Sequence, residues 1–309
     1  HEAGILAGDR ILAVDGQSTE GLDTNGVSRL VRGKAGTKVT LTIYSPGDDA
    51  TREVTLTRAE IQMKSVKRVG MLDSTASIGH LAITHFQDGT AKEVSLAIDA
   101  LLARGMKSLV IDVRNNPGGL FDEAVAIADL FLESGVIVST RGRIKDANRE
   151  ELAVAEGTLP GFPVALVVNQ GSASASEILA GALQDHRRAV LVGARTYGKG
   201  SVQRVYPFDD GERGALKLTT ARYYTPSGRS IHKTKDDVGG IVPDVLITLS
   251  IDEQREMARK IREETLRRRS EGGEIGAPEY VDPQLQRAID VLKGVPVYRK
   301  LSDAGGGDE

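Results

Sequence analysis

The hydrophobic and polar positions of the chain change their period after residue 58. Before that point, short stretches alternate between apolar and polar residues, as in half-buried β-strands, and one run has the three- and four-residue spacing of a short helix. The pattern predicts strands over 9–14, 37–45 and 51–59 and a helix over 24–33. Residues 1–58 are therefore expected to form a small β-rich module.

From residue 88, short continuous apolar runs alternate with amphipathic runs. A continuous apolar run is typical of a strand buried on both faces, and the amphipathic runs have helical spacing. Repeated strand–loop–helix units predict an α/β fold with a parallel or mixed sheet covered by helices. The expected strands are 66–72, 78–84, 107–114, 162–169, 189–193, 215–225 and 240–249, and the expected helices are 90–105, 120–135 and 176–188.

The pattern divides the chain into three parts, with a module over 1–58, a core over 59–250 and a charged C-terminal helical extension and tail over 251–309. Within the extension, 252–270 is a helix with only a thin stripe of apolar positions. It is either a solvated helix or a contact between two copies in a homodimer.

Composition removes several classes of function. The 309 residues carry a net charge of −3 and are 40% hydrophobic, so a core is expected and nucleic acid is not an expected partner. The absence of cysteine excludes disulfides and thiolate chemistry. No apolar run reaches the length of a membrane span, so any membrane proximity would come from a segment upstream of His1.

Three serines lie in the loop between the strand over 162–169 and the helix that follows it: Ser172, Ser174 and Ser176. Ser174 precedes Glu177 by three positions and an apolar run follows, which predicts a capping box at the start of a helix. Such a cap stabilises a helix by about 1 kcal/mol. A serine at an exposed turn can also act as a nucleophile, so the local pattern leaves both roles open.

A catalytic serine needs a base. His186 lies at the far end of the same helix, roughly 18 Å away by helix rise, which is too far for it to be the base of Ser174. No histidine shows metal-ligand spacing, so we expect no metal and no cofactor. Lys199, between two glycines after the strand over 189–193, returns to the same sheet edge. A lysine acts as a base only when burial makes it neutral, and the alternative is an exposed loop lysine. If residues 201–208 form a strand, Gln203 shares a face with Ser201 and its amide can orient the lysine amine.

Several motifs resemble the carboxyl-terminal processing (tail-specific) serine proteases, in the order and spacing of that family over about residues 1–250. They are VIDVRNNPGGLFDEAV, VVNQGSASASEILAGALQD, GARTYGKGSVQ, TTARYYTPSGRSI and GIVPDV. The stretches AGILAGDRILAVDG and VRGKAGT resemble a PDZ domain, whose peptide-binding loop would precede residue 1. One departure is His80, where the family usually shows tyrosine.

The resemblance implies a crotonase/ClpP-like protease core with a partial PDZ domain at its N-terminus. It places the nucleophile on Ser174, the base on Lys199 and an assisting side chain on Gln203. The oxyanion donors fall on the N–H groups of Ala175 and Gly118, although a plain turn is an equal alternative for the Gly118 loop.

The resemblance also implies an endopeptidase that cleaves protein substrates near apolar C-termini, exported to the bacterial periplasm or cell envelope. Arg32 is the candidate to sense the bound substrate end, and an ordinary surface arginine is the alternative. Two other functions are compatible with the fold: a catalytically inactive PDZ-containing peptide-binding scaffold, and an acyl-CoA enzyme on the related core.

Overall fold

The computed structural model describes residues 3–5, 8–46, 49–60, 64–208, 214–270, 276 and 278–305. The chain forms two compact units. The smaller comprises residues 1–63 with 262–274, and the larger comprises 64–261 with 275–309. The larger unit therefore extends past residue 250, where the sequence analysis placed the end of the core. Residues 306–309 of the expected tail lie outside the described residues.

The smaller unit contains a four-stranded antiparallel sheet in the order β2-β1-β3-β4. Alternation along β3 buries Val39, Leu41 and Ile43, which form a small core with Val14. The helix and the strands β1, β3 and β4 lie where the sequence pattern predicted them, whereas the two-residue strand β2 was not predicted. Their bounds are β1 (Arg10–Val14), β2 (Gln17–Ser18), α1 (Thr24–Val31), β3 (Lys38–Ser45) and β4 (Ala50–Thr57).

The larger unit is built on a six-stranded mixed sheet in the order β14-β11-β10-β7-β6-β5. All neighbours are parallel except β5, which runs antiparallel to β6. The predicted α/β architecture is confirmed, although the last strand is only two residues long. The strands are β5 (Val66–Asp73), β6 (Ile78–Ile83), β7 (Ser108–Asp112), β10 (Val164–Val168), β11 (Val190–Gly193) and β14 (Val245–Leu246).

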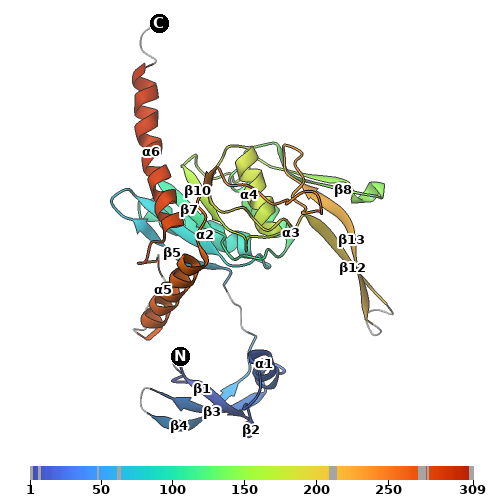
Figure 1. Ribbon diagram of the computed structural model, residues 1–309, viewed down its shortest axis with the longest axis vertical. Helices are drawn as coiled ribbons and strands as arrows, with labels where there is room; N and C mark the ends of the chain where they lie inside the picture. The colour runs from blue at the N-terminus through green and yellow to red at the C-terminus, as the bar shows by residue number, and fades with distance from the viewer. Residues whose placement is uncertain are drawn as a thin grey trace. The chain divides into compact units, whose positions relative to one another are not determined.

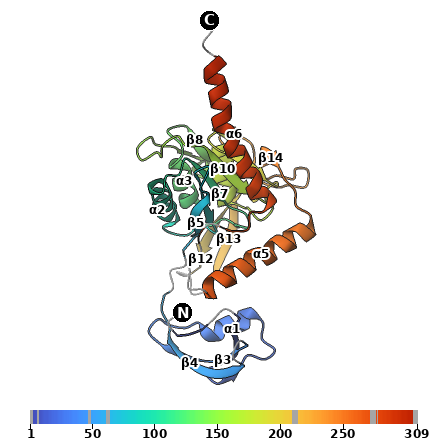
Figure 2. The same cartoon turned by 90° about the vertical axis from the view of Figure 1, so that its left-hand side faces the viewer.

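Each face of this sheet has its own helical cover (Figures 1 and 2). Leu109 and Ile111 pack on one side with α2 (Thr90–Ala103), α3 (Phe121–Asp129) and α4 (Ala175–Asp185). The intervening Val110 belongs to the opposite face, together with the buried residues of α6. Because residues of a strand alternate between faces, a continuous apolar run such as β7 is required between two covered faces.

A second, four-stranded antiparallel sheet in the order β12-β13-β8-β9 belongs to the same unit. The sequence pattern did not predict β8 and β9. The second of these reads Arg-Glu-Glu-Leu, which has no apolar run, and it is mostly exposed. In Figure 1 the hairpin of β12 and β13 extends away from the six-stranded sheet. The bounds are β8 (Val136–Gly142), the 3₁₀ turn η1 (Lys145–Ala147), β9 (Arg149–Leu152), β12 (Ser201–Pro207) and β13 (Ala215–Tyr224).

Two helices follow the last strand: α5 (Ile251–Ser270) and α6 (Pro283–Gly305). The expected charged helix is confirmed as α5. The first half of α6 packs on the sheet through Leu285, Ala288, Ile289 and Leu292, all buried. None of the helices formed by the described residues has both the length and the apolar character needed to cross a bilayer.

The burial of α6 makes a testable prediction about stability. Leu285 is 1% exposed against the sheet, so Leu285→Ala should lower the free energy of unfolding by about 2–5 kcal/mol. Leu96→Ala on α2 is the matched control, because Leu96 is 59% exposed and should change stability by less than about 0.5 kcal/mol. Urea denaturation measures both. Equal, small effects would show that α6 is not part of the core.

Candidate active site

The structure distinguishes the three serines of the loop before α4. Ser172 and Ser176 are fully buried. The Ser172 hydroxyl donates to the Val113 carbonyl at 2.8 Å, and the Ser176 hydroxyl donates to the Asn116 carbonyl at 3.0 Å. Both therefore join this loop to the loop that follows β7. Ser174 is half-buried, so it is the serine of the three that solvent reaches.

Ser174 has a backbone conformation that non-glycine residues rarely adopt, with φ 57° and ψ −113°. It is the N-cap residue of α4, and the predicted capping box is present. Glu177 Oε2 accepts a hydrogen bond from the Ser174 N–H at 2.8 Å. A strained serine on a sharp strand-to-helix turn is the arrangement that presents a nucleophile at a sheet edge.

The glycine loop after β7 lies directly against Ser174. A Cβ atom at Gly118 would come within 2.8 Å of the Ser174 Cβ and 2.9 Å of the Ala175 nitrogen, so glycine is needed for this approach. The Asn116 carbonyl also accepts the Ala173 N–H at 3.0 Å. The two loops that were expected to share a sheet edge are in contact.

The two expected oxyanion donors differ in their present partners. Ala175 is the first residue of α4, where the helix supplies no acceptor for its N–H. The Gly118 N–H donates to the Asn116 side-chain oxygen at 2.9 Å. Asn116 is itself buried and held through its amide by the Ile83 carbonyl.

Glu177 is fully buried and links Ser174 to the lysine loop. Besides the Ser174 N–H, its carboxylate accepts the Thr196 hydroxyl at 2.6 Å and the Gly198 N–H at 2.6 Å, both on Oε1. Its Oε2 also accepts the Lys199 N–H at 2.8 Å. These contacts are 19–22 positions distant in sequence, so sequence reasoning assigned Glu177 only its local capping role.

The structure brings the backbone of Lys199 to this carboxylate but leaves the residue exposed. No hydrogen bond joins the Lys199 amine to the Ser174 hydroxyl anywhere in the described part of the chain. The burial that would make a lysine amine neutral is therefore absent from this arrangement. Gln203 is also exposed, on β12 opposite Thr219 of β13.

Three other residues that the sequence analysis considered lie outside this cluster. His186 follows α4 at its C-terminal end, and its Nε2 lies 2.7 Å from the Val136 carbonyl, as expected for a structural histidine. Arg32 is exposed at the C-cap of α1 in the smaller unit. His80 is fully buried, and burial holds the pKa of its imidazole below the usual value.

A cavity of about 250 Å³ adjoins Gln203. Phe121 and Tyr223 stack in its wall with ring centres 5.5 Å apart. Burial, together with the charge of Asp122, raises the pKa of Tyr223. The cavity has both apolar and charged walls. Its remaining lining residues are Thr140, Ala147, Arg149, Glu151, Val202, Arg204, Thr220 and Ala221.

The described residues contain no group of three or more His, Asp or Glu side chains arranged to hold a metal ion.

Two protein-family models match different parts of this chain. Residues 77–247 match peptidase family S41, and residues 1–45 match a PDZ domain. The chain is 43% identical over 259 residues to the carboxy-terminal-processing protease of Bartonella bacilliformis, covering 82% of this chain and 57% of that relative. It is 37% identical over 305 residues to the carboxyl-terminal-processing protease of Synechocystis, covering 97% of this chain and 64% of that relative.

Two solved structures are also similar. The photosystem II D1 C-terminal processing protease matches with a TM-score of 0.52 and 33% identity, over 80% of this chain and 65% of that one. An S41 protease from Bacteroides fragilis matches with a TM-score of 0.57 over 95% of this chain and 75% of that one. Its 19% identity shows likeness of fold alone. The chain thus spans somewhat less than two thirds of the length of the curated relatives named above.

The Glu177 contacts predict a strong effect of removing its charge. In Glu177→Gln the side-chain NH₂ would face backbone N–H donors, so unfolding free energy should fall by about 2 kcal/mol or more. Glu133→Gln is the matched control, because Glu133 is exposed. Chemical denaturation measures both variants. A Glu177→Gln protein as stable as the control would show that the carboxylate does not hold the two loops together.

Proposed function

The chain belongs to peptidase family S41, and we propose that it acts as a serine endopeptidase that cleaves protein substrates near their C-termini. The observation that carries the proposal is the position of Ser174. Of the three serines in its loop, it is the one accessible to solvent. It also has a strained backbone and contacts the Gly118 loop. The names of the similar proteins support the same activity for this chain.

The proposed reaction begins when the neutral amine of Lys199 takes the proton of the Ser174 hydroxyl. Ser174 Oγ then forms a bond to the scissile carbonyl carbon, and the negative charge on the carbonyl oxygen is held by backbone N–H groups. Collapse of this intermediate breaks the C–N bond, and the leaving amine takes the proton from Lys199. Water, activated by the same lysine, then hydrolyses the acyl-enzyme.

The exposed position of Lys199 requires a rearrangement before this step. The backbone N–H of Lys199 is already fixed to Glu177 at 2.8 Å, so a turn of the side chain is enough to change where its amine lies. We propose that substrate binding covers the amine and brings it to Ser174, with Gln203 orienting it. Catalytic hydrogen bonds often tighten only when substrate is bound.

The oxyanion site is proposed to use the N–H groups of Ala175 and Gly118. The Gly118 N–H would have to leave Asn116 Oδ1, its present acceptor, as the oxyanion forms. A structure with a peptide boronate bound to Ser174 tests this. The Gly118 N–H should then donate to the boronate oxygen, and a Gly118 N–H still bound to Asn116 would reject its role.

Several finer assignments belong to the same proposal. The PDZ module recognises the substrate end or gates the site, with Arg32 binding the substrate carboxylate. The substrates have apolar C-termini, and the protein is exported to the periplasm or cell envelope.

The strand–loop–helix core is proposed to be related to the crotonase/ClpP-like folds, since a glycine loop opposes a helix N-terminus at its sheet edge. We also propose a homodimer through the C-terminal helix. Sedimentation velocity that shows only monomer would rule it out.

Substitution of the two reacting groups tests the chemistry. Ser174→Ala and Lys199→Ala should each lower kcat for peptide cleavage by on the order of 10⁴-fold, because the members of a catalytic pair act as one unit. Stability should change by no more than about 1 kcal/mol in Ser174→Ala, where a cap is lost. Ser134→Ala and Lys235→Ala are matched controls at exposed positions and should cleave like the parent protein. Retained cleavage in a purified Lys199→Ala protein would reject the lysine as the base.

Arg32 has its own test. Two peptides of one sequence, one with a free C-terminal carboxylate and one amidated, should be cleaved at different rates by the parent protein. Arg32→Ala should lower the rate for the free peptide to that of the amidated one, because the charge that binds the carboxylate is gone. Arg29→Ala, also exposed on α1, should keep the difference. A preserved difference in Arg32→Ala would remove Arg32 from substrate recognition.

A further inference from the structure

Arg114, the last residue before the Asn-Asn-Pro-Gly-Gly loop, carries a guanidinium that is almost fully buried, with 4% of its side chain exposed. Asp112 takes one edge, accepting from Nε at 3.0 Å and from Nη2 at 2.8 Å. Burial alone would raise the pKa of Asp112, but the charge and hydrogen bonds of Arg114 outweigh burial and hold it below its usual value. The first side of the guanidinium is therefore held by its own strand end.

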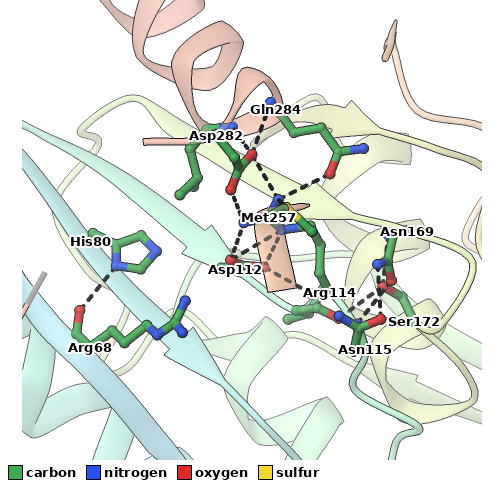
Figure 3. A network of polar contacts seen from close by, with 12 residues as sticks. Arg68, His80, Asp112, Arg114, Asn115, Asn169, Ser172, Met257, Asp282 and Gln284 are labelled. Carbon is green, nitrogen blue, oxygen red and sulfur yellow. Dashed lines mark hydrogen bonds and ion pairs between the residues drawn. The ribbon is translucent and has the colours of Figure 1, made fainter. Parts of the chain in front are cut away.

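The other side of the guanidinium is held by residues far away in sequence (Figure 3). Arg114 Nη1 donates to Asp282 Oδ1 at 2.9 Å and to Gln284 Oε1 at 3.0 Å. Asp282 Oδ2 lies 2.8 Å from Nη2 as an ion pair without hydrogen-bond geometry. Asp282 immediately precedes α6 and Gln284 lies in its first turn. Both lie beyond residues 77–247, the stretch that matches the peptidase family.

The position of Arg114 determines where the glycine loop can lie. The next residue, Asn115, exchanges two hydrogen bonds with Asn169, its N–H donating to Asn169 Oδ1 at 2.9 Å. Asn116 then receives hydrogen bonds from the serine loop and accepts the Gly118 N–H. A shift of Arg114 would therefore be passed through two residues to the loop that faces Ser174.

Asp282 has two separable roles. Its Oδ1 also accepts the N–H groups of Gln284 and Leu285 at 3.0 Å, so it caps the start of α6. Its other role is to receive the Arg114 guanidinium. A buried guanidinium needs acceptors for all its N–H groups, and Asp112 reaches only some of them.

We propose that Asp282 is a positioning residue for the proposed peptidase reaction, acting through Arg114 on the glycine loop that faces Ser174. The segment that starts α6 is then part of the catalytic machinery as well as a cover for the sheet. The inference rests on the proposed function. To that function it adds a residue, Asp282, that contacts neither the substrate nor the nucleophile.

Asp282→Ser separates the two roles, because serine is a good N-cap but its short side chain cannot also reach Arg114. We expect kcat for peptide cleavage to fall about 10- to 100-fold with KM within about twofold, since a small displacement of a catalytic loop costs rate rather than binding. The affinity for a peptide boronate, which places an oxygen in the oxyanion site, should fall by a similar factor. Asp290→Ser, exposed on α6, is the matched control and should behave like the parent protein.

Hydrogen exchange supplies a readout that does not depend on activity. In Asp282→Ser, the amides of residues 113–120 should exchange faster than in Asp290→Ser, while those of β10 keep their protection. Asp282→Asn, which keeps a neutral acceptor and the cap, should restore most of the rate.

The outcomes separate the inference from the function on which it rests. If the parent protein cleaves peptides and Asp282→Ser matches it in kcat, boronate affinity and exchange, Asp282 is only a helix cap and the inference is wrong. If kcat falls only in proportion to a loss of folded protein, the inference is also wrong. If the parent protein cleaves no peptide, or Ser174→Ala cleaves equally well, the proposed function fails, whereas the exchange result still reports whether Asp282 positions the loop.

Discussion

The buried carboxylate of Glu177 receives hydrogen bonds from both loops on which the proposed chemistry depends. Its two oxygens accept backbone N–H groups of Ser174, Gly198 and Lys199 and the hydroxyl of Thr196. A carboxylate buried without such donors would be strongly unfavourable, so the loops and the charge require each other. The backbones of the proposed nucleophile and base are thereby fixed relative to one another, while the lysine side chain remains free to be repositioned.

A second layer of contacts fixes the glycine loop against the same serine. The buried hydroxyls of Ser172 and Ser176 join the loops after β7 and β10, and Arg114 ties the first of these to the segment that begins α6. The parallel strands β7, β10 and β11 explain why the loops after them can meet, because these strands end at the same edge of the sheet. The proposed catalytic site is thus held together by residues from four separate stretches of the chain.

Much of this arrangement could be predicted from local patterns, and the rest depended on tertiary packing. The capping box at Ser174 spans four residues, so the sequence shows it directly, as the apolar runs show the buried strands. The Thr196 and Lys199 contacts of Glu177 cannot be inferred in this way, since a spacing of 19–22 residues has no periodic signature. Exposure of Lys199 is likewise a property of packing. The start of α6 did carry a readable signal, because aspartate followed by proline is a favoured N-cap and first helical residue.

The proposed site requires that Ser174 is a nucleophile and that Lys199 activates it. Reaction with a fluorophosphonate, followed by intact-mass and peptide-mapping mass spectrometry, tests it without knowledge of the natural substrate. We expect a single adduct on Ser174 in the parent protein and a greatly slowed reaction when Lys199 is replaced by alanine. An adduct on another residue, or labelling of Ser174 at the parent rate without Lys199, would contradict it.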